Sequence, residues 1–321
     1  MTTQPLVKVA VLDDYQNVAL AMADWSILEG RAEVTVFNDH LVDPAAVIAR
    51  LLPFEVVCVM RERTPLPQAT LERLGRLRLI VSTGPRNASI DLEAARQRGI
   101  TVCNTGYSSH GAMEMTWALI LSAIRYVPAE TASVRGGGWQ VAVGGDLRGK
   151  TLGIVGLGTI GTAIARVAHA FEMETVAWSQ NLNRENAEQA GVRLVGKEEL
   201  FRVSDVVTLH LVLSRRTRGI VGAPELNLMK PSAWLVNTSR GPLIQEAALV
   251  DVLQKRRIAG AALDVYDAEP LPPDHPFRVL DNMVATPHVG FVTRDTYQTF
   301  YRDTVENIAA WLDGHPLRVA W

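Results

Sequence analysis

The chain has 321 residues, of which 48% are hydrophobic and 21% charged, and 32 basic residues nearly balance 34 acidic ones. This balance excludes a strongly basic nucleic-acid-binding protein, and two cysteines, Cys58 and Cys103, are too few for a disulfide framework. The length favours two domains. No transmembrane run and no signal peptide are recognisable, so we expect a cytoplasmic protein that binds neither nucleic acid nor membranes.

The first third of the chain predicts a parallel β-sheet. Short apolar runs rich in β-branched residues alternate there with helical stretches or long crossovers. Strands of this kind, joined by such crossovers, are typical of parallel sheets that helices cover on both faces. The expected strands are residues 7–12, 33–37, 56–60, 79–82 and 101–104.

A second series of strands with the same character begins near residue 151. The expected strands are residues 151–155, 175–178, 205–211, 233–237, 260–265 and 283–285. Together the two series predict an α/β fold with two doubly wound parallel-sheet domains.

Two longer amphipathic helices are expected outside these strands. One spans residues 113–124 and ends before Pro128, and the other spans residues 297–312, with Gly314 just beyond its end. Residues 135–150 are rich in glycine, which predicts either a plain linker or an arm that embraces a partner subunit.

Gly156, Gly158 and Gly161 form a GxGxxG motif between an expected strand and an expected helix. In this context the first glycine permits a tight turn, the second lets a pyrophosphate approach the backbone, and the third lets the helix pack on the strand. The free N–H groups at the helix N-terminus, those of Thr159 and Ile160, then face the phosphates. The motif predicts a dinucleotide-binding site, with a plain tight turn as the alternative.

The next expected strand lacks the acidic residue that binds the ribose 2′-hydroxyl of NAD in many such sites. Ser179, Asn181 and Arg184 follow this strand instead, and each can donate a hydrogen bond. No carboxylate is there to repel a 2′-phosphate. The expected cofactor is therefore NAD(H) or NADP(H), and the sequence leaves both open.

Three residues with complementary chemistry each follow an expected strand, namely Arg240, Glu269 and His288. Because ligands bind at the carboxyl edge of open parallel sheets, we expect the three side chains on one rim. An arginine pairs with a carboxylate, a histidine exchanges a proton near neutral pH, and a glutamate orients that histidine. The set fits hydride transfer at C2 of a 2-hydroxy or 2-oxo acid, although each residue taken singly is also compatible with a structural role.

From about residue 79 to residue 315 the chain resembles the D-isomer-specific 2-hydroxyacid dehydrogenases, the family of phosphoglycerate dehydrogenases and glyoxylate or hydroxypyruvate reductases. The catalytic Arg, Glu and His of that family match Arg240, Glu269 and His288. The blocks that carry the resemblance are residues 156–161, 204–210, 235–242, 262–270 and 286–290.

The resemblance implies a domain arrangement and a partner. A Rossmann cofactor domain, residues 105–289, would be inserted into a flavodoxin-like substrate domain, residues 1–104 plus 290–321. The family also implies a homodimer formed through the cofactor domain, which would give the glycine-rich segment a role.

Further site residues follow from the resemblance alone. Those implied to contact the cofactor are His210, Val212 and Thr217 on the adenosine side, Thr238 at the nicotinamide ribose, and Asp264 near the carboxamide. Those implied to contact the substrate are Gly84, in a loop whose backbone N–H groups hold the carboxylate, and Arg61. The chain departs from the family where Val212 replaces a frequent proline and where Pro85-Arg86-Asn87 follows Gly84.

We therefore expect an NAD(P)-dependent oxidoreductase that transfers a hydride between the cofactor and C2 of a small D-2-hydroxy acid or 2-oxo acid. In this hypothesis Arg240 binds the carboxylate, His288 is the acid and base, and Glu269 orients His288. Two alternatives stay open: a dinucleotide-sensing binding protein like the corepressors of this fold, and an oxidoreductase of the formate or phosphite type. The remaining histidines lack metal-ligand spacing, so no metal is expected.

Overall fold

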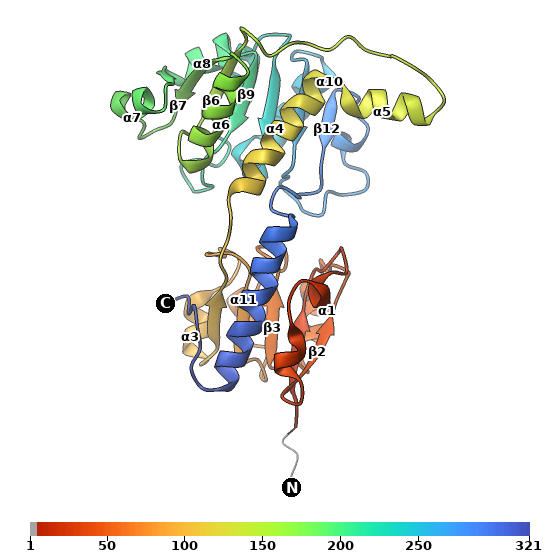
Figure 1. Cartoon of the computed structure of the whole chain (residues 1–321), viewed down its shortest axis with the longest axis vertical. Helices are drawn as coiled ribbons and strands as arrows, with labels where there is room; N and C mark the ends of the chain where they lie inside the picture. The colour runs from red at the N-terminus through yellow and green to blue at the C-terminus, as the bar shows by residue number, and fades with distance from the viewer. Residues whose placement is uncertain (1–4) are drawn as a thin grey trace. The chain divides into compact units, whose positions relative to one another are not determined.

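The computed structural model describes residues 5–321, which form two compact units (Figure 1). Unit 1 consists of the described residues up to Ser108 together with Val292–Trp321, and unit 2 is Ser109–Phe291. Each unit contains one parallel β-sheet, so the predicted α/β fold with two parallel-sheet domains is confirmed. No helix among residues 5–321 is long and apolar enough to cross a membrane.

The sheet of unit 1 has five parallel strands in the order β2-β1-β3-β4-β5. This is the flavodoxin-like order, in which the chain changes winding direction between β1 and β3. All of β3 and β4 is buried, as expected for strands that helices cover on both faces. The strands are β1 (Val7–Val11), β2 (Ala32–Val36), β3 (Val56–Val59), β4 (Leu79–Ser82) and β5 (Thr101–Asn104).

Helices pack on both faces of this sheet. Helices α1 (Pro44–Leu51), α2 (Gln68–Leu71) and α3 (Leu92–Gln97) share one apolar core with the strands. Helix α11 (Arg294–Leu312) packs against β4 and also against the short 3-10 helix at Trp25–Leu28. Gly314 follows the end of α11 with φ +81°, which confirms its predicted place after the helix.

The sheet of unit 2 has seven parallel strands in the order β12-β11-β10-β9-β6-β7-β8. Counted within the unit this is the Rossmann order with one added strand, and the winding direction changes between β6 and β9. The strands are β6 (Thr151–Val155), β7 (Glu174–Trp178), β8 (Arg193–Leu194), β9 (Val206–Leu209), β10 (Trp234–Asn237), β11 (Gly260–Leu263) and β12 (Met283–Ala285).

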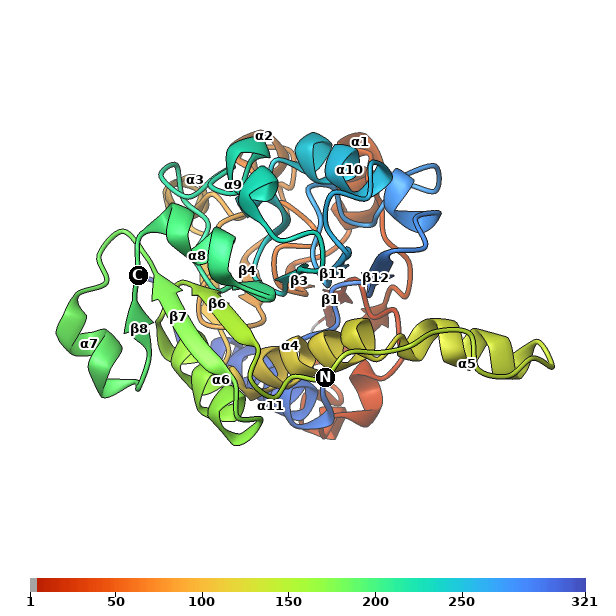
Figure 2. The ribbon, with the colours of Figure 1, turned by 90° about the horizontal axis from the view of Figure 1, so that it is seen from above.

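Two apolar cores lie on the two faces of this sheet. Helices α4 (His110–Ile124) and α6 (Thr159–Ala170) form one core with the strands. The other core contains α8 (Lys197–Val203), α9 (Ala223–Leu228) and α10 (Glu246–Gln254). Helix α7 (Arg184–Gln189) packs beside β8 at the sheet edge. The view from above shows the sheet between two layers of helices, α4 and α6 on one face and α8, α9 and α10 on the other (Figure 2).

Helix α5 (Val127–Arg135) has no buried residue and projects beyond the sheet of unit 2 in both views (Figures 1 and 2). The predicted end of the preceding helix before Pro128 is confirmed. Helix α4 ends at Ile124, Tyr126 adopts a left-handed φ of 51°, and Pro128 lies in the first turn of α5. Proline is well tolerated there because the first turn of a helix has N–H groups without intrahelical partners. Residues 136–150 then form a loop, as predicted.

Candidate active site

The carboxyl edge of the unit 2 sheet is the candidate ligand site, because its winding direction changes between β6 and β9. Strand β6 runs into the glycine motif and β9 runs into His210. Val155 and Leu209 are paired across these two strands. The glycine loop and the β9 loop therefore start side by side.

Gly156 and Gly161 have the turn and packing roles that the sequence predicts, and Gly158 leaves open space. Gly156 has φ +104°, and a Cβ on it would lie 2.7 Å from the carbonyl oxygen of His210. A Cβ on Gly161 would lie 2.2 Å from the carbonyl oxygen of Gly156, so only glycine lets α6 approach the strand. A Cβ on Gly158 would meet nothing within 4 Å.

The open space at Gly158 lies at the start of α6. Gly158 is the N-cap of this helix and offers no side-chain acceptor to the first N–H groups, which include those of Thr159 and Ile160. Free N–H groups and the helix dipole favour an anion at this point. The residues present therefore fit the pyrophosphate of a dinucleotide.

His210 lies beside this loop and is held in its neutral form. Burial lowers the pKa of its imidazole to about 3. Its Nε2 lies 2.9 Å from the hydroxyl of Thr208, whereas its buried Nδ1 has no partner among residues 5–321. A buried polar atom without a partner, on a residue whose backbone touches Gly156, is consistent with a ligand group that completes the site.

The predicted acid–base pair is present on the same edge. Nδ1 of His288 lies 2.5 Å from Oε2 of Glu269, and Oε1 of Glu269 accepts the backbone N–H of Tyr266 at 2.8 Å. The bond to a carboxylate fixes the proton on Nδ1, so Nε2 is the ring nitrogen that is left for chemistry. Partial burial raises the pKa of Glu269, but the hydrogen bond and charge of His288, with smaller contributions from Tyr266 and Arg240, outweigh it. The net pKa is below the ordinary value.

Arg240 is positioned by the turn that follows β10. Its carbonyl oxygen accepts Nδ2 of Asn237 at 2.9 Å, and its guanidinium donates to the carbonyl oxygen of Ser239 at 2.7 Å. The next residue, Gly241, packs directly on the loop after β11. A Cβ on Gly241 would lie only 2.0 Å from the carbonyl carbon of Tyr266. This close contact joins the loop of Arg240 to the loop of Glu269.

Asp264 holds the loop that carries His288. Its buried carboxylate accepts the hydroxyl of Thr286 at 2.6 Å and the backbone N–H groups of Val289 and Gly290 at 2.9 and 2.7 Å. Burial raises the pKa of Asp264 despite these bonds. His288 itself has a left-handed φ of 53° and packs edge-on against Phe291. Asp264 therefore supports the turn at residues 286–290, a role that the sequence alone did not indicate.

The other predicted cofactor residues are all in loops at or near this edge. Thr238 donates its hydroxyl to that of Thr116 at 2.7 Å, because the proton of Thr116 goes to the carbonyl oxygen of Ala112. Thr217 is buried, and Val212 is highly exposed. Ser179 and Asn181 follow the end of β7.

Unit 1 brings together the two predicted substrate residues. A Cβ on Gly84, which has φ +86°, would lie 2.3 Å from Nη1 of Arg61. Arg61 has a left-handed φ of 55°, and its guanidinium lies 4.9 Å from the ring centroid of Tyr107. The backbone N–H of Gly84 donates to the hydroxyl of Thr105 at 2.7 Å. Tyr107 and Thr105 were not expected at this site, and nothing in their sequence context distinguishes them from ordinary loop residues.

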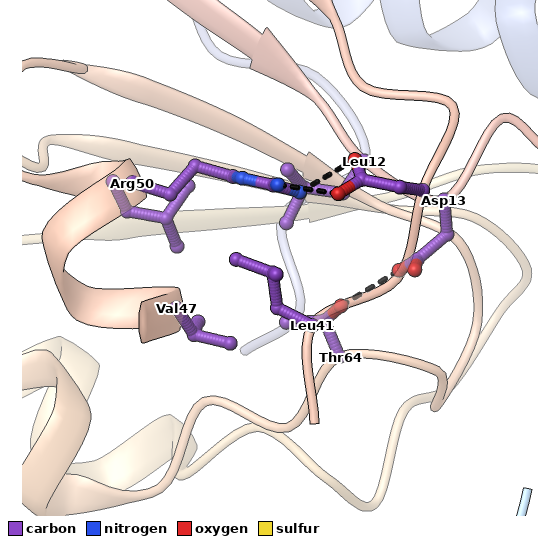
Figure 3. Close-up of a pocket in the computed structure, with 8 residues that line it drawn as sticks. Leu12, Asp13, Leu41, Val47, Arg50 and Thr64 are labelled. Carbon is purple, nitrogen blue, oxygen red and sulfur yellow. Dashed lines mark hydrogen bonds and ion pairs between the residues drawn. The ribbon is translucent and has the colours of Figure 1, made fainter. Parts of the chain in front are cut away.

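A small cavity elsewhere in unit 1 is not a substrate site. Figure 3 shows Asp13 and Thr64 in contact beside Leu12, Leu41, Val47 and Arg50, and the cavity between them has a volume of about 10 Å³. Such a volume holds one water molecule at most. No group of three His, Cys, Asp or Glu residues that could hold a metal ion occurs in the described part of the chain.

The parallel sheet and the glycine loop define a dinucleotide-binding protein of the Rossmann class. Residues 117–290 match the family model described as "D-isomer specific 2-hydroxyacid dehydrogenase, NAD binding domain". The chain is 39% identical over 254 residues to a glyoxylate reductase from Aeropyrum pernix, and the match covers 76% of each chain. It spans only about half the length of the curated D-3-phosphoglycerate dehydrogenases that it matches, 52% of one and 58% of another.

Solved structures agree with this match. A phosphoglycerate oxidoreductase from Vibrio cholerae O395 has a TM-score of 0.91 at 38% identity, over 96% of this chain and 100% of that one. An acyclic imino acid reductase in complex with NADPH and D-Arg has a TM-score of 0.74 at 27% identity, over 98% and 99% of the two chains. The chain belongs to the D-isomer-specific 2-hydroxyacid dehydrogenase family, a family of oxidoreductases of CH–OH donors, and its cofactor is NAD(P)(H).

Proposed function

We propose that the protein reduces a small 2-oxo acid to the D-2-hydroxy acid with NADH or NADPH, and catalyses the reverse oxidation. The observation that carries this proposal is the hydrogen bond between His288 and Glu269. The pair lies at the carboxyl edge of the unit 2 sheet, as do Arg240 and the glycine loop. Relatives named glyoxylate reductase and hydroxypyruvate reductase support substrates of this size. No observation favours the corepressor-like or the formate-type alternative.

Each residue of the set has one task in the reaction. The guanidinium of Arg240 binds the substrate carboxylate and polarises the C2 carbonyl oxygen. The bound nicotinamide supplies the hydride to C2. Nε2 of His288 gives a proton to the C2 oxygen, which becomes the hydroxyl group, and takes it back in the oxidation. Glu269, ionised at neutral pH, holds the imidazole in place and stabilises its charged form.

The cofactor would be held by the residues already described. The backbone at Gly156, Gly158 and Gly161, with the N–H groups of Thr159 and Ile160, would bind the pyrophosphate. The adenosine side would be lined by Ser179, Asn181, His210, Val212 and Thr217, and the nicotinamide side by Thr238, with Asp264 behind the His288 turn. On this assignment unit 2 is the cofactor domain.

Unit 1 would then be the substrate domain. Arg61 lies against Gly84, and its backbone N–H donates to the hydroxyl of Thr83 at 2.9 Å, while Asn87 donates to its carbonyl oxygen at 2.6 Å. These bonds fix the backbone of Arg61, and its guanidinium, which lies over the Tyr107 ring, can bind a carboxylate through two parallel hydrogen bonds. We assign Arg61 and the Gly84 loop to the substrate.

The acid–base assignment is tested with His288→Ala in the full chain. Single-turnover reduction of glyoxylate, hydroxypyruvate and pyruvate is measured with NADH and with NADPH. The hydride-transfer rate should fall by about 10²- to 10⁴-fold, the usual contribution of a general acid. His315→Ala, at an exposed position, is the matched control. A wild-type rate in His288→Ala rejects the assignment, and no turnover of any 2-oxo acid by the wild type rejects the proposed reaction.

The positioning role of Glu269 has its own readout. In Glu269→Gln the carboxylate that stabilises the imidazolium is gone, so kcat for reduction should fall by about 10- to 100-fold. The loss should fall on kcat and leave KM for the 2-oxo acid nearly unchanged, because in this assignment Glu269 contacts His288 and not the substrate. A raised KM with an unchanged kcat contradicts the role.

We further propose a homodimer in the cytoplasm, without nucleic-acid or membrane partners. Helix α5 buries none of its residues in the chain, and Val134 and Val143 in this projecting segment are 57% and 95% exposed. Apolar groups on a projecting arm are best explained by a second subunit that covers them.

A further inference from the structure

The end of β7 is where a Rossmann sheet contacts the ribose of the adenosine half of its cofactor. Here β7 ends at Trp178, and residues 179–184 contain no carboxylate. Asn183 is engaged as the N-cap of α7, where its side chain accepts the N–H of Asn186 at 2.8 Å. The side chains of Ser179 and Asn181 have no hydrogen-bond partner among residues 5–321.

The loop after β9, residues 212–218, lies against this turn. Nε2 of Gln180 donates to the carbonyl oxygen of Arg216 at 3.4 Å, which brings the two loops into contact. Within the β9 loop, the buried hydroxyl of Thr217 makes two hydrogen bonds to the backbone. This hydroxyl donates to the carbonyl oxygen of Val212 at 2.7 Å and accepts the N–H of Ser214 at 2.8 Å. These two bonds tie Val212 and Ser214 to Thr217, so that the loop folds back on itself beside the expected ribose position.

The β9 loop carries three arginines and no acid, and they differ in their surroundings. Burial raises the pKa of the Asp267 carboxyl, and the nearby positive charge of Arg218 partly offsets this increase. Arg218 therefore already has an acidic neighbour. In contrast, the exposed side chains of Arg215 and Arg216 make no hydrogen bond or ion pair with any residue that the structure describes.

A lysine near the end of β7 is already satisfied. Lys197, whose ammonium group lies 5.6 Å from the ring centroid of Trp178, donates to the carbonyl oxygen of Ile220 and pairs with Glu225 at 2.9 Å. Two guanidinium groups without a partner among residues 5–321 thus remain on the β9 loop, which touches a turn without carboxylates. A guanidinium is the side chain best suited to a phosphate group, which it can bind through two parallel hydrogen bonds.

We propose that Arg215 and Arg216 bind the 2′-phosphate of NADP(H), with Ser179 and Asn181 as hydrogen-bond donors, so that the enzyme prefers NADP(H) to NAD(H). The proposal rests on the dinucleotide site proposed above and goes beyond it by naming the phosphate state and two residues that decide it. The ribose of NAD(H), which has a 2′-hydroxyl, would meet no carboxylate acceptor here.

The test uses two ligands that cannot transfer hydride, ADP-ribose and 2′-phospho-ADP-ribose, so that it is independent of the substrate. Calorimetric titration of the full chain should show tighter binding of the phosphorylated ligand by about 10- to 100-fold, as expected for charge-assisted hydrogen bonds. In Arg215→Ala/Arg216→Ala this preference should disappear while the affinity for ADP-ribose stays the same. Arg218→Ala, an arginine of the same loop, should keep the preference.

A second variant tests the same preference at the turn after β7. Ser179→Asp places a carboxylate directly after β7, where it repels a 2′-phosphate and accepts the 2′-hydroxyl. Its affinity for 2′-phospho-ADP-ribose should fall by at least about tenfold, with ADP-ribose bound as well as before or better.

The outcomes separate this inference from the proposed reaction. Equal wild-type affinity for the two ligands, or equal loss of both in the double arginine variant, overturns the inference even if 2-oxo acids are reduced. A strong preference for the phosphorylated ligand that the double variant abolishes supports it even if every 2-oxo acid tested is inert. Failure to bind either ligand overturns both the inference and the dinucleotide site.

Discussion

Among single residues, His210 shows how burial and chemistry are linked in this site. The backbone carbonyl of His210 lies against Gly156, its imidazole contacts Thr208 of β9, and burial lowers the pKa of the imidazole to about 3 from an ordinary value of 6.5. At neutral pH the ring is uncharged in the folded chain and mostly uncharged in the unfolded chain. A neutral ring at this edge of the sheet adds hydrogen-bonding groups without adding a charge that varies with pH.

The same pKa shift makes the stability of the fold depend on pH. The unfolded chain binds a proton at His210 near pH 6.5, whereas the folded chain binds it only near pH 3. Between these values the unfolded state holds more protons, so the free energy of unfolding decreases as the pH falls, by about 1.4 kcal/mol per pH unit from this residue. Above pH 6.5 both states hold mainly the neutral ring, so His210 causes no loss of stability there.

We predict that His210→Gln reduces this pH dependence, because Gln has no proton to gain. Urea unfolding at pH 7.5, 6.0 and 5.0 should give a shallower loss of stability in the variant than in the wild type, by up to about 1.4 kcal/mol per pH unit. His315→Gln, at an exposed position, should retain the wild-type slope. Equal slopes for His210→Gln and the wild type would show that the ring is not kept neutral by burial.

At the scale of secondary-structure elements, the turn from β6 to α6 uses its glycines for two different purposes. Gly161 lies where helix and strand touch, and Gly158 lies where the backbone faces open space. The first requirement concerns the packing of the fold and the second concerns a ligand. The two substitutions by alanine should therefore have different effects.

We predict that Gly161→Ala destabilises the protein by about 1–3 kcal/mol, since its Cβ has no room beside the carbonyl of Gly156. Gly158→Ala should fold with a wild-type Tm but bind ADP-ribose at least about tenfold more weakly, because the methyl group occupies the space of the pyrophosphate. Thermal unfolding and calorimetry measure the two effects. Unchanged ligand affinity in Gly158→Ala would place the pyrophosphate elsewhere.

At the scale of the whole molecule, the segment from α5 to residue 150 is the part that the fold of one chain does not explain. Helix α5 contributes nothing to either core of unit 2, and apolar side chains along it and along the following loop are exposed. Isolated helices of this length are marginal in water, so a stable α5 needs a surface to pack against. A second copy of the chain supplies such a surface in the proposed dimer.

We predict that Val134→Glu/Val143→Glu shifts the protein from dimer to monomer, because charges in a buried apolar interface are costly. Sedimentation velocity at several concentrations measures the mass. Val279→Glu introduces the same charge at a residue that is 84% exposed outside this segment, and should leave the dimer intact. A wild-type protein that sediments as a monomer at all concentrations would refute the dimer itself.

The alternation of strands and helices could be derived from the sequence because local periodicity decides it. Strands β4, β5, β6 and β12 have the expected bounds. Strand β8 was missed, because two residues, Arg193 and Leu194, carry no apolar pattern and pair only through their neighbour β7. The expected strand at residues 205–211 is shorter, since the chain leaves the sheet at His210.

The sequence by itself determined the parallel α/β class, the glycine motif and the order in which Arg240, Glu269 and His288 follow their strands, because each of these depends on residues close together in the chain. Only the tertiary structure decided that Glu269 reaches His288, that Asp264 supports the His288 turn, and that the loop of Arg216 touches the turn after β7. These contacts join residues 19 to 36 positions apart along the chain, and the order of strands in the sheet, which no local pattern encodes, brings them together.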